Sequence, residues 1–593
     1  MITTLYFGCD TETYNDGDHY GLKSIQLVGE DTELYFLSDD YSNEDDEYIR
    51  SEISYKFIRY LSELKDNVKV AFFNMTFDVS QFLKFLVSES GYKVIHEYQG
   101  RLSKGQIQFL ETDRKLFSVK FRSFISGYLI EFIDLSNFAV ASTLDDVCKA
   151  WIGKRKIEIE SKEFPKRHPT EKEKLYAMQD AKLTYELYMK FLEESVIEQK
   201  TYTIAGRTIK DFKHFIKANY CTNFEKLFFN TDDPEEIQAM KDMFEIELRS
   251  GVKGGICQSY QKGIFEHVTH IDACSMYPTQ MHKDWIPYGG LLSEEPKSRH
   301  TKIVYPVGWY RLKPDRVPCV QWTSKSNAFR YAYLNVYECG EYVKDFYLDG
   351  SYPIWIEEYE IILNQYEVFN EEIVKTWYIR LRENIILKQY VEMLYDGKRH
   401  NTGSKRLFFK YLLNSLYGKF LTRPDGITID YVYENDEWHR IKVVNEKATY
   451  YLPLGMWVSM MGRVTLMKAI ISIDSSNFIY CDTDSIVFKG DKMPSVSIGK
   501  NLGDWSIEQQ DITANIVGQK TYQELIDEPD KSYWITKCGG LPRKTKDSLY
   551  WKMLKDGLTV KCAKPKRDKK TWAINILDTE YTVSVKANMF RRG

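Results

Sequence analysis

The stretch FIYCDTDSIVF, from Phe478 to Phe488, constrains the fold of this chain more than any other. Apolar residues lead into it and out of it, which predicts two short buried strands joined by a tight acidic turn. The turn holds Asp482 and Asp484, and side-chain alternation would put both carboxylates on one side. Such a hairpin tip suits Mg²⁺, which takes oxygen ligands and leaves room for phosphates. An ordinary Asp-rich turn is the alternative, because Asp favours turns for local reasons.

Length, charge and cysteine usage narrow the class of protein. A chain of 593 residues is too long for one core, so several domains are expected. The net charge is only −4, so any binding of phosphates must be local. The ten cysteines include no CxxC pair, which argues against a structural zinc site. Without a basic leader or a run of 18 apolar residues, we expect a soluble, cytosolic protein with no membrane segment.

The N-terminal part of the chain presents carboxylates at strand-like positions. The segment LYFGCDTET carries Asp10 and Glu12 two residues apart, and therefore on one face of a strand. The segment VAFFNMTFDVSQF predicts a buried strand that ends at Asn74 and Asp78. An Asp-x-Glu spacing arises by chance in a chain this charged, so it indicates a functional site only together with further carboxylates.

A predicted helix supplies a further carboxylate. The segment HPTEKEKLYAMQDAKLTYELYMKF begins with a capping-box pair, Thr170 and Glu173, and places Tyr176 and Asp180 on one face. Together with the three strand carboxylates, Asp180 could converge on two metal ions about 4 Å apart, with Tyr176 orienting a water for in-line attack. A solvated acidic helix face would explain Asp180 alone, but not the ordered set.

After about residue 200, RSGVKGGICQSY brings Gly254 and Gly255, which permit close backbone approach to a ligand or form a plain turn. In HIDACSMYPTQM, a strand delivers Asp272 and places Tyr277 at its exit. Beside the acidic hairpin tip, Asp272 would complete a carboxylate triad for two-metal phosphoryl transfer.

A basic stripe follows in KRHNTGSKRLFFKYLLNSLYGKF. Arg406, Lys410, Asn414 and Tyr417 fall at spacings of four, four and three, and therefore on one face of a helix. Cations for phosphates and a ring for a base are what a nucleoside triphosphate requires. An amphipathic helix with a solvated basic face is an equal alternative on this segment alone.

The order of these motifs resembles that of family B DNA polymerases. DTET, NMTFD and YAMQD resemble the three proofreading exonuclease motifs, and DACSMYP, KYLLNSLYG and YCDTDS resemble polymerase motifs A, B and C. KTY, from Lys520 to Tyr522, looks like the KxY primer-binding motif, and SMMGR is similar to the Tx2GR template motif. The NSLYG form is similar to the protein-primed branch of bacteriophages with linear double-stranded DNA genomes. The YxGG motif departs from the pattern, because Val252 replaces its tyrosine.

The resemblance implies a multidomain α/β fold: a ribonuclease-H-like 3′–5′ exonuclease domain, then a right-hand polymerase of palm, fingers and thumb with two terminal-protein-region insertions. The basic end of the chain, with nine Lys or Arg against three acids over residues 561–593, would be the thumb on duplex product. The expected boundaries are exonuclease 1–202, palm 203–285 and 451–550, first insertion 286–383, fingers 384–421, second insertion 422–450 and thumb 551–593.

The resemblance also implies residue roles at the polymerase centre. Asp272 and Asp484 would bind two catalytic ions, with Asp482 alongside and Ala273 among the metal contacts. Tyr277 would be the steric gate against a ribose 2′-hydroxyl. The remaining nucleotide contacts would be Lys398, Arg406, Lys410, Asn414 and Tyr417. The expected DNA contacts of this half are Gly254, Gly255, Ser459, Arg463, Lys520 and Tyr522.

In the exonuclease, Asp10, Glu12 and Asp180 would hold the metal, with Asp78 and Tyr176 as further catalytic residues. Asn74 and Phe77 would bind the unpaired primer end. An auxiliary lysine is expected in the cluster Lys154, Arg155 and Lys156; we assign it to Lys156, although the sequence leaves the choice within this cluster open.

The predicted enzyme extends primer-template DNA with dNTPs, starting from a terminal protein, and removes errors with its exonuclease. Mg²⁺, two ions per active site, is the expected cofactor, and Mn²⁺ would substitute. A phage single-stranded-DNA-binding protein is a further expected partner, and the infected host's cytoplasm the expected location. A nucleic-acid-primed family B enzyme and an inactive DNA-binding scaffold are the rival hypotheses, the latter opposed by the intact motif carboxylates.

Overall fold

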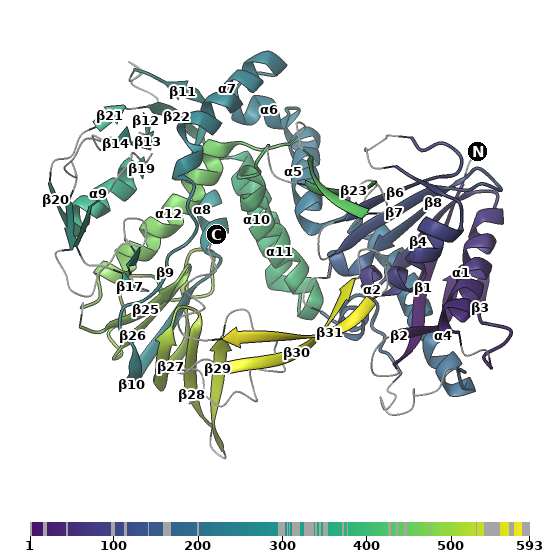
Figure 1. Cartoon of the computed structure of the whole chain (residues 1–593). Helices are drawn as coiled ribbons and strands as arrows, with labels where there is room; N and C mark the ends of the chain where they lie inside the picture. The colour runs from purple at the N-terminus through teal and green to yellow at the C-terminus, as the bar shows by residue number, and fades with distance from the viewer. Residues whose placement is uncertain are drawn as a thin grey trace.

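The structure is a computed structural model that describes residues 3–583 with internal gaps (Figure 1). Residues outside the description are 1–2, 16–19, 43–44, 96–100, 112–114, 140–141, 158–167, 198–200, 295–302, 305, 308, 311–320, 325–336, 339–340, 343–344, 348–353, 370–372, 376, 425–427, 435–436, 444–447, 475, 529–530, 539–557, 568–573 and 584–593. Two large sheets lie at opposite ends of the molecule, and helices fill the space between them (Figure 1).

The N-terminal sheet has eight strands in the order β3-β2-β1-β4-β8-β7-β6-β5. Its central strands β1, β4 and β8 run parallel, while β2 and β7 join them antiparallel. The strands are β1 (Thr4–Asn15), β2 (Tyr20–Gly29), β3 (Thr32–Phe36), β4 (Asn67–Phe72), β5 (Lys93–Val94), β6 (Gln106–Glu111), β7 (Leu116–Arg122) and β8 (Leu129–Asp134).

Helices cover both faces of this sheet, as the strand sequences require. Val70 and Phe72 of β4 are buried with residues of α1 (Asp46–Glu63) and α2 (Met75–Lys84), whereas Ala71 between them is buried with residues of α4 (Glu171–Glu193). This alternation is the period of two of an extended strand. The predicted capping box at the start of α4 is present, because Thr170 and Glu173 each bond the other's backbone N–H.

The second sheet has seven strands in the order β29-β28-β27-β10-β26-β25-β9, with all neighbouring pairs antiparallel. The predicted acidic hairpin is present as β25 and β26 at the side of β10. The strands are β9 (Cys257–Ser259), β10 (Gly263–Ala273), β25 (Phe478–Asp482), β26 (Ser485–Lys489), β27 (Trp505–Gly518), β28 (Thr521–Glu528) and β29 (Lys531–Cys538).

Helices connect the two sheets and share one large apolar core with them. Of these, α11 runs through the centre of the molecule beside α10 (Figure 1). They are α3 (Leu144–Ile152), α5 (Ile204–Tyr220), α6 (Phe224–Phe228), α7 (Pro234–Glu247), α8 (Met276–Met281), α10 (Ile386–His400), α11 (Gly403–Phe420) and α12 (Leu452–Ile471).

Helix α12 bears on the expectation that no segment could cross a membrane. Among the described residues, it alone is long and apolar enough by length and composition, although Arg463 and Lys468 interrupt it. Of its most apolar window, 78% is buried inside the structure, and buried core helices meet the same criterion.

The first expected insertion is framed by β11 (Trp285–Leu292) and β22 (Tyr378–Glu383), which pair antiparallel. Much of it lies outside the described residues. Its described elements are α9 (Ile356–Gln365) and the short strands β12 (Ile303–Val304), β13 (Pro306–Val307), β14 (Trp309–Tyr310), β15 (Gln321–Ser324), β16 (Tyr337–Glu338), β17 (Glu341–Tyr342), β18 (Asp345–Tyr347), β19 (Ile354–Trp355), β20 (Tyr366–Phe369) and β21 (Ile373–Lys375).

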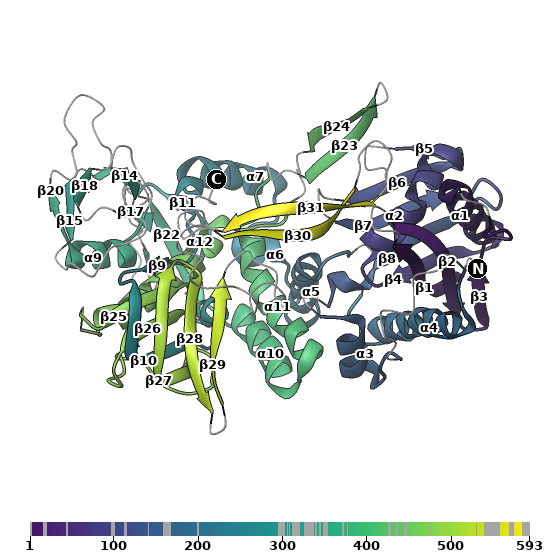
Figure 2. The same ribbon diagram turned by 60° about the horizontal axis from the view of Figure 1, so that its bottom comes forward.

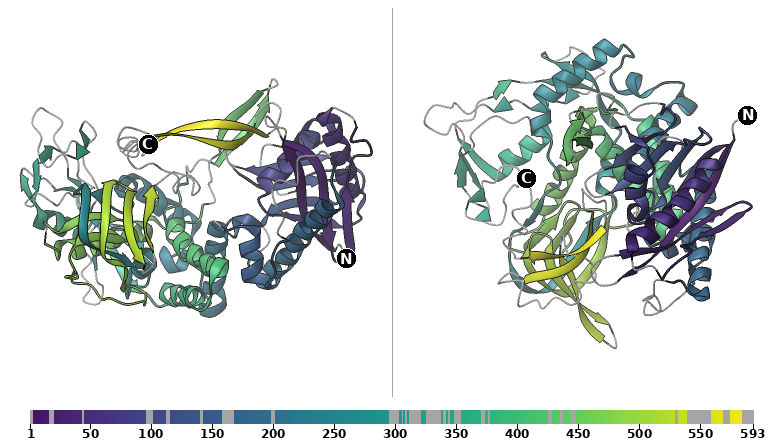
Figure 3. Two further views of the ribbon diagram at one scale, coloured as in Figure 1. Left: turned by 90° about the horizontal axis from the view of Figure 1, so that it is seen from below. Right: turned by 45° about the vertical axis from the view of Figure 1, so that its right-hand side comes forward.

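Two isolated hairpins complete the fold. The hairpin character expected of the second insertion is confirmed, because β23 (Thr428–Glu434) pairs with β24 (Glu437–Val443). The basic C-terminal segment forms β30 (Leu558–Arg567) and β31 (Ile574–Val583), and β31 reaches α2 of the N-terminal domain. Figure 2 and the left view of Figure 3 place both hairpins on the same side of the molecule.

Candidate active sites

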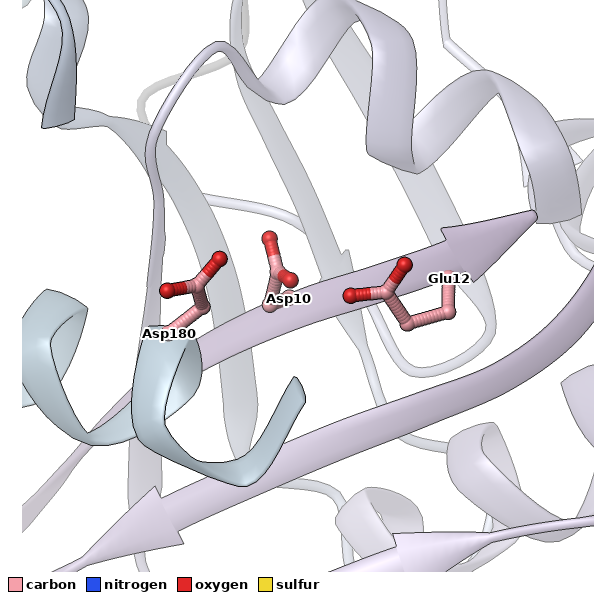
Figure 4. A group of neighbouring side chains, drawn as sticks. All are labelled: Asp10, Glu12 and Asp180. Carbon is pink, nitrogen blue, oxygen red and sulfur yellow. The ribbon is translucent and has the colours of Figure 1, made fainter. Parts of the chain in front are cut away.

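The first carboxylate centre lies where β1 faces α4. Asp10 and Glu12 project from one face of β1 toward Asp180, which α4 presents to them (Figure 4). One oxygen from each of the three carboxylates lies within 4.8 Å of the others. The predicted period-two placement of Asp10 and Glu12 is therefore confirmed.

Gly8 allows this close approach of strand and helix. A Cβ atom at Gly8 would lie 2.2 Å from the backbone nitrogen of Tyr185 in α4. Any side chain there would push α4, and with it Asp180, away from β1. Sequence reasoning missed Gly8, although its position two residues before Asp10 on the same strand face was a signal.

Burial and mutual repulsion make this cluster unfavourable without a cation. Desolvation and the charges of Asp78 and Glu12 raise the pKa of Asp10 well above its ordinary value. Desolvation and the charge of Asp180 raise the pKa of Glu12 to about 8. In addition, Asp180 Oδ1 is buried without a hydrogen-bond partner among the described residues. A divalent cation with oxygen ligands would relieve all three features, so the donor set fits such an ion.

The structure selects Lys156 from the basic cluster. Its ammonium forms an ion pair with Asp180 and lies 5.1 Å from the centre of the Tyr176 ring. Lys154 instead pairs with Glu186 at 2.6 Å, and Arg155 with Asp145 at 3.2 Å. Both of these pairs are on the surface, so only Lys156 enters the carboxylate centre.

Two sequence predictions about the neighbouring segment need correction. The strand β4 ends at Phe72, and Asp78 lies on helix α2 rather than at a strand end. Asp78 is also outside the three-carboxylate cluster; its Oδ1 accepts a hydrogen bond of 2.7 Å from Thr11 Oγ1. Burial raises the pKa of Asp78 to about 7. The left-handed backbone of Asn74 (φ 72°) starts α2 and accounts for the misplaced boundary.

Asp134, at the end of β8, is a site residue that sequence reasoning missed. Its carboxylate is buried and accepts the backbone N–H of Asn74 at 3.0 Å. It thereby fixes the left-handed turn that leads into α2. An Asp that closes the buried run LIEFID was the available signal, since the ends of parallel strands meet at one edge of a sheet.

A groove of about 760 Å³ opens beside this centre. Asp10, Asn74 and Lys156 line it, together with the rings of Phe73 and Phe117. Phe77 is half-buried on α2 and does not contribute to the described lining, so the structure brings Asn74 but not Phe77 into the groove.

The second carboxylate centre forms where β10 meets the β25–β26 turn. Thr483 has a left-handed backbone (φ 56°), so the turn is tighter than the extended alternation predicted from the sequence. The backbone N–H of Ala273 donates to the Asp484 carbonyl at 2.7 Å, which ties Asp272 and Asp484 to adjacent strands. Desolvation and the charge of Asp484 raise the pKa of Asp272 to about 7, and desolvation also raises that of Asp484. This pair also fits a divalent cation.

Asp482 lines the same cavity as Asp272 and Asp484, but is paired with a lysine. Lys520 Nζ lies 3.0 and 2.9 Å from its two oxygens, and thus neutralises it. The structure thus adds a lysine partner for Asp482, the carboxylate expected to lie alongside the two metal ligands Asp272 and Asp484. Lys520, which is expected to contact the primer, forms an ion pair with Asp482 in this structure.

A cavity of about 880 Å³ covers this centre and receives the predicted cationic face of α11. Arg406, Lys410 and Asn414 line it together with the carboxylates, and Tyr522 also belongs to the lining. Lys398 of α10 also faces the cavity, where its Nζ donates to Ser275 Oγ at 2.7 Å. Burial and the neighbouring charges of Lys410 and Arg406 lower the pKa of Lys398.

Tyr277 lines the cavity, and Tyr417 packs against it. The rings of Tyr277 and Tyr417 stack with centroids 4.3 Å apart and an interplanar angle of 20°. Both are half-buried, and desolvation raises the pKa of each. Sequence spacing placed Tyr417 on the face of α11 that carries Lys410, and the structure adds Tyr277 as its partner.

The expected template contacts Ser459 and Arg463 are instead buried. Arg463 forms an ion pair with Glu358 at 2.6 Å and donates to the carbonyls of Lys253 and Gly254. Ser459 Oγ donates to the carbonyl of Met456 at 3.0 Å. The structure therefore assigns both residues to internal packing rather than to a surface that DNA can reach.

The two glycines differ from each other. A Cβ at Gly255 would lie 2.6 Å from Thr483, so this glycine lets the loop rest on the turn that carries Asp484. Space around Gly254 is open. The structure thus shows a close approach of Gly255 to the acidic turn.

Two separate carboxylate centres, one in a groove with cations and rings and one under a cationic helix, define a DNA polymerase with its own exonuclease. The chain belongs to the family described as DNA polymerase type B, organellar and viral, which matches residues 149–499, more than half of its length. A 3′–5′ exonuclease family matches residues 2–195. The sequence prediction of a family B polymerase with a proofreading domain is confirmed.

The chain is similar to DNA polymerases of bacteriophages. The DNA polymerase of Bacillus phage Nf is 26% identical over 418 residues, covering 64% of this chain and 68% of the relative. The DNA polymerase of Bacillus phage phi29 is 25% identical, covering 64% and 67%. In fold, the structure of phi29 DNA polymerase with primer-template DNA and incoming nucleotides has a TM-score of 0.74 at 18% identity, covering 98% and 100%. The expected fold class is thus confirmed.

Proposed function

We propose that this polymerase copies a linear phage genome from a protein primer and displaces the strand ahead of it. The observation that carries the proposal is the β23–β24 hairpin, inserted between α11 and α12 on the same side of the molecule as the basic β30–β31 hairpin. Two hairpins on one side can enclose a DNA duplex and part its strands. The similarity to the phage polymerases supports the same assignment.

At the polymerase centre, a primer hydroxyl attacks the α-phosphate of a dNTP, and pyrophosphate leaves. Asp272 and Asp484 would hold two Mg²⁺ ions, for which Mn²⁺ would substitute, and these ions would supply positive charge to the attacking and leaving oxygens. Lys398, Arg406 and Lys410 hold the triphosphate, because they line the same cavity as those carboxylates. The main chain of Ala273 lies at the same centre, and Asn414 contacts the nucleotide.

The stacked tyrosines select the sugar and the base of the incoming nucleotide. The ring of Tyr277 lies on that of Tyr417 and against Gly462 of α12, where a Cβ would come within 3.3 Å of the ring. Because the ring is held on two sides, it cannot move away from a ribose 2′-hydroxyl. We therefore assign Tyr277 as the steric gate, and Tyr417 as the support for the nascent base pair.

At the exonuclease centre, a water attacks the last phosphodiester of an unpaired primer end. Asp10, Glu12 and Asp180 hold the divalent ions there, and Tyr176 with Lys156 orients the water or the scissile phosphate. Asp78 lies on α2 close enough for its charge to raise the pKa of Asp10, and would thereby favour a bound cation there. Asn74 positions the strand in the groove.

The partners and the location follow from this function. Primer-template DNA and dNTPs are the substrates, a terminal protein supplies the first hydroxyl, and a phage single-stranded-DNA-binding protein covers the displaced strand. The enzyme would act in the cytoplasm of the infected bacterium, where the genome is replicated.

Nucleotide transfer to protein tests the proposal. The purified polymerase is incubated with Mg²⁺, a labelled dNTP and each protein encoded beside it, without any nucleic-acid primer. A labelled protein that forms with the native enzyme, and does not form with the Asp484→Asn variant, is the expected result. A polymerase that extends DNA primers efficiently but labels none of these proteins is a nucleic-acid-primed enzyme, and the proposal is then wrong.

A further inference from the structure

Helix α11 lines both the polymerase cavity and the exonuclease groove. Lys410 and Asn414 face the polymerase cavity, whereas Tyr411 and Ser415, each one residue further on, line the exonuclease groove. One residue turns a helix by about 100°, so the two pairs occupy adjacent faces of the same rod. The helix that holds the nucleotide is therefore also a wall of the groove that contains Asp10.

This wall is held firmly against the exonuclease domain. The Phe408 ring packs edge-on against Trp151 of α3, with centroids 5.6 Å apart. The Lys405 ammonium lies 4.7 Å from the centre of the same Trp151 ring and pairs with Glu194 at 2.7 Å. Because these contacts flank Tyr411 by only one or two helical turns, they fix its position relative to the groove.

The described lining of the groove has the composition of a single-stranded DNA site. Phe73 and Phe117 supply rings from the N-terminal domain, and Lys115 and Lys156 supply positive charge. Tyr411 faces them from α11 and is half-buried, with part of its surface open to the groove. Bases stack on such rings whatever their sequence, and cations hold the backbone.

We propose that the ring of Tyr411 stacks on a base of the frayed primer end and so makes α11 part of the exonuclease substrate site. Tyr411 is a binding residue for single-stranded DNA in this role, and takes no part in the chemistry. This inference rests on the proposed assignment of the Asp10 cluster as the exonuclease centre.

Excision of a single-stranded oligonucleotide tests the stacking. Tyr411→Leu removes the ring at similar volume, and should raise KM for excision about tenfold while kcat changes less than about twofold, as loss of one stacked base predicts. Tyr411→Phe keeps the ring and should retain the native KM. Unchanged KM in Tyr411→Leu, or equal loss in Tyr411→Phe, would overturn the proposal.

A spectroscopic measurement separates stacking from a general disturbance of α11. With 2-aminopurine at the 3′ end and excision blocked by Asp10→Ala with Glu12→Ala, binding should quench the fluorescence, and Tyr411→Leu should abolish most of that quenching. Phe409→Leu is the matched control, since Phe409 is half-buried on the same helix, rests on Gly397 of α10 and lies outside both described linings. Equal loss of quenching in Phe409→Leu would overturn the proposal.

The same experiments distinguish a wrong exonuclease assignment from a wrong role for Tyr411. If Asp10→Ala with Glu12→Ala still degrades single strands, the exonuclease assignment fails, and the role of Tyr411 fails with it. If that double variant is inactive but Tyr411→Leu binds and excises like the native enzyme, only the role of Tyr411 is wrong.

Discussion

The two carboxylate centres of this molecule use their lysines in opposite ways. In the exonuclease centre, Lys156 enters a cluster of three carboxylates and partly compensates their charge. In the polymerase centre, Lys520 pairs with Asp482, which lies beside the two proposed metal ligands Asp272 and Asp484. The lysine of one centre therefore contacts a proposed metal ligand directly, whereas that of the other contacts a neighbouring carboxylate.

The double substitution Asp10→Ala with Glu12→Ala should have the largest effect. It removes two of the three clustered ligands, so excision of single-stranded DNA should fall by at least about 10⁴-fold, while extension with dNTPs remains within about twofold. Rates of excision and extension, measured on the same preparation, check both statements. Parallel loss of the two activities in a folded variant would contradict the separation of the centres.

Asp484→Asn should have the reverse effect, with loss of extension and retention of excision. Loss of one ligand charge from the polymerase pair should reduce extension by about 10³-fold or more, because the stabilisation of transition-state charge is lost only there. Excision should stay within about twofold of the native rate. A primer-extension time course and an excision assay decide the outcome, and a variant that loses excision as well would argue for a shared site.

Lys156→Met tests the internal lysine of the exonuclease centre. The Asp180 carboxylate would lose its ion pair and Tyr176 its neighbouring cation, so excision should fall by about 10- to 100-fold, a range typical for groups that support metal ligands. Lys154→Met is the control, because Lys154 pairs with Glu186 on the surface. If both variants lose excision equally, the assignment of Lys156 is wrong.

Without divalent ions, the free energy of unfolding should depend on pH. Burial and the charge of Asp484 raise the pKa of Asp272 to about 7, so the folded protein keeps a proton there that the unfolded chain releases from about pH 4 upward. The free energy of unfolding should therefore fall as the pH rises from about 4 to 7, and Mg²⁺ should restore it most at high pH. Melting temperatures in EDTA and in Mg²⁺ measure this. An Asp272→Asn variant with the native pH slope would contradict the assignment.

The sequence predicted most of the elements because local signals and burial agree along them. The capping box of α4, the period-two faces of β1 and the β25–β26 hairpin are all confirmed. The i, i+4 face of α11 is likewise correct for Lys410 and Asn414. Hydrophobic periodicity determines these features within a single segment.

What the sequence did not reveal depends on contacts between distant segments. The pairing of Arg463 with Glu358 joins residues 105 positions apart, and that of Lys520 with Asp482 joins residues 38 apart. No periodicity encodes such pairs. The left-handed residues Asn74 and Thr483 also escaped prediction, because the tertiary hydrogen bonds of their turns fix them. These features explain why Arg463 is buried, why Asp78 lies on α2, and how Lys520 comes to pair with Asp482.

The smallest expected effect concerns Lys520, whose pairing with Asp482 produces the contrast between the centres. The lysine is half exposed, so its ion pair is worth little, about 1 kcal/mol or less. Lys520→Met should therefore reduce extension only about fivefold. The KxY resemblance explains the same loss by a contact to the primer strand, and a single variant cannot separate these two explanations.

A double-mutant cycle separates them. If Lys520 acts by holding Asp482, then Asp482→Asn removes the charge that it neutralises, and adding Lys520→Met to that variant should cost nothing further. If Lys520 binds the primer independently, the two losses should multiply, and the loss due to Lys520 should shrink as salt concentration rises. Extension rates of the four enzymes at two salt concentrations give the coupling. Because Lys520 reaches both oxygens of Asp482 within 3.0 Å, we expect the loss of about fivefold due to Lys520→Met to disappear in the Asp482→Asn variant, as it should where the third carboxylate of the polymerase centre is held by the protein itself.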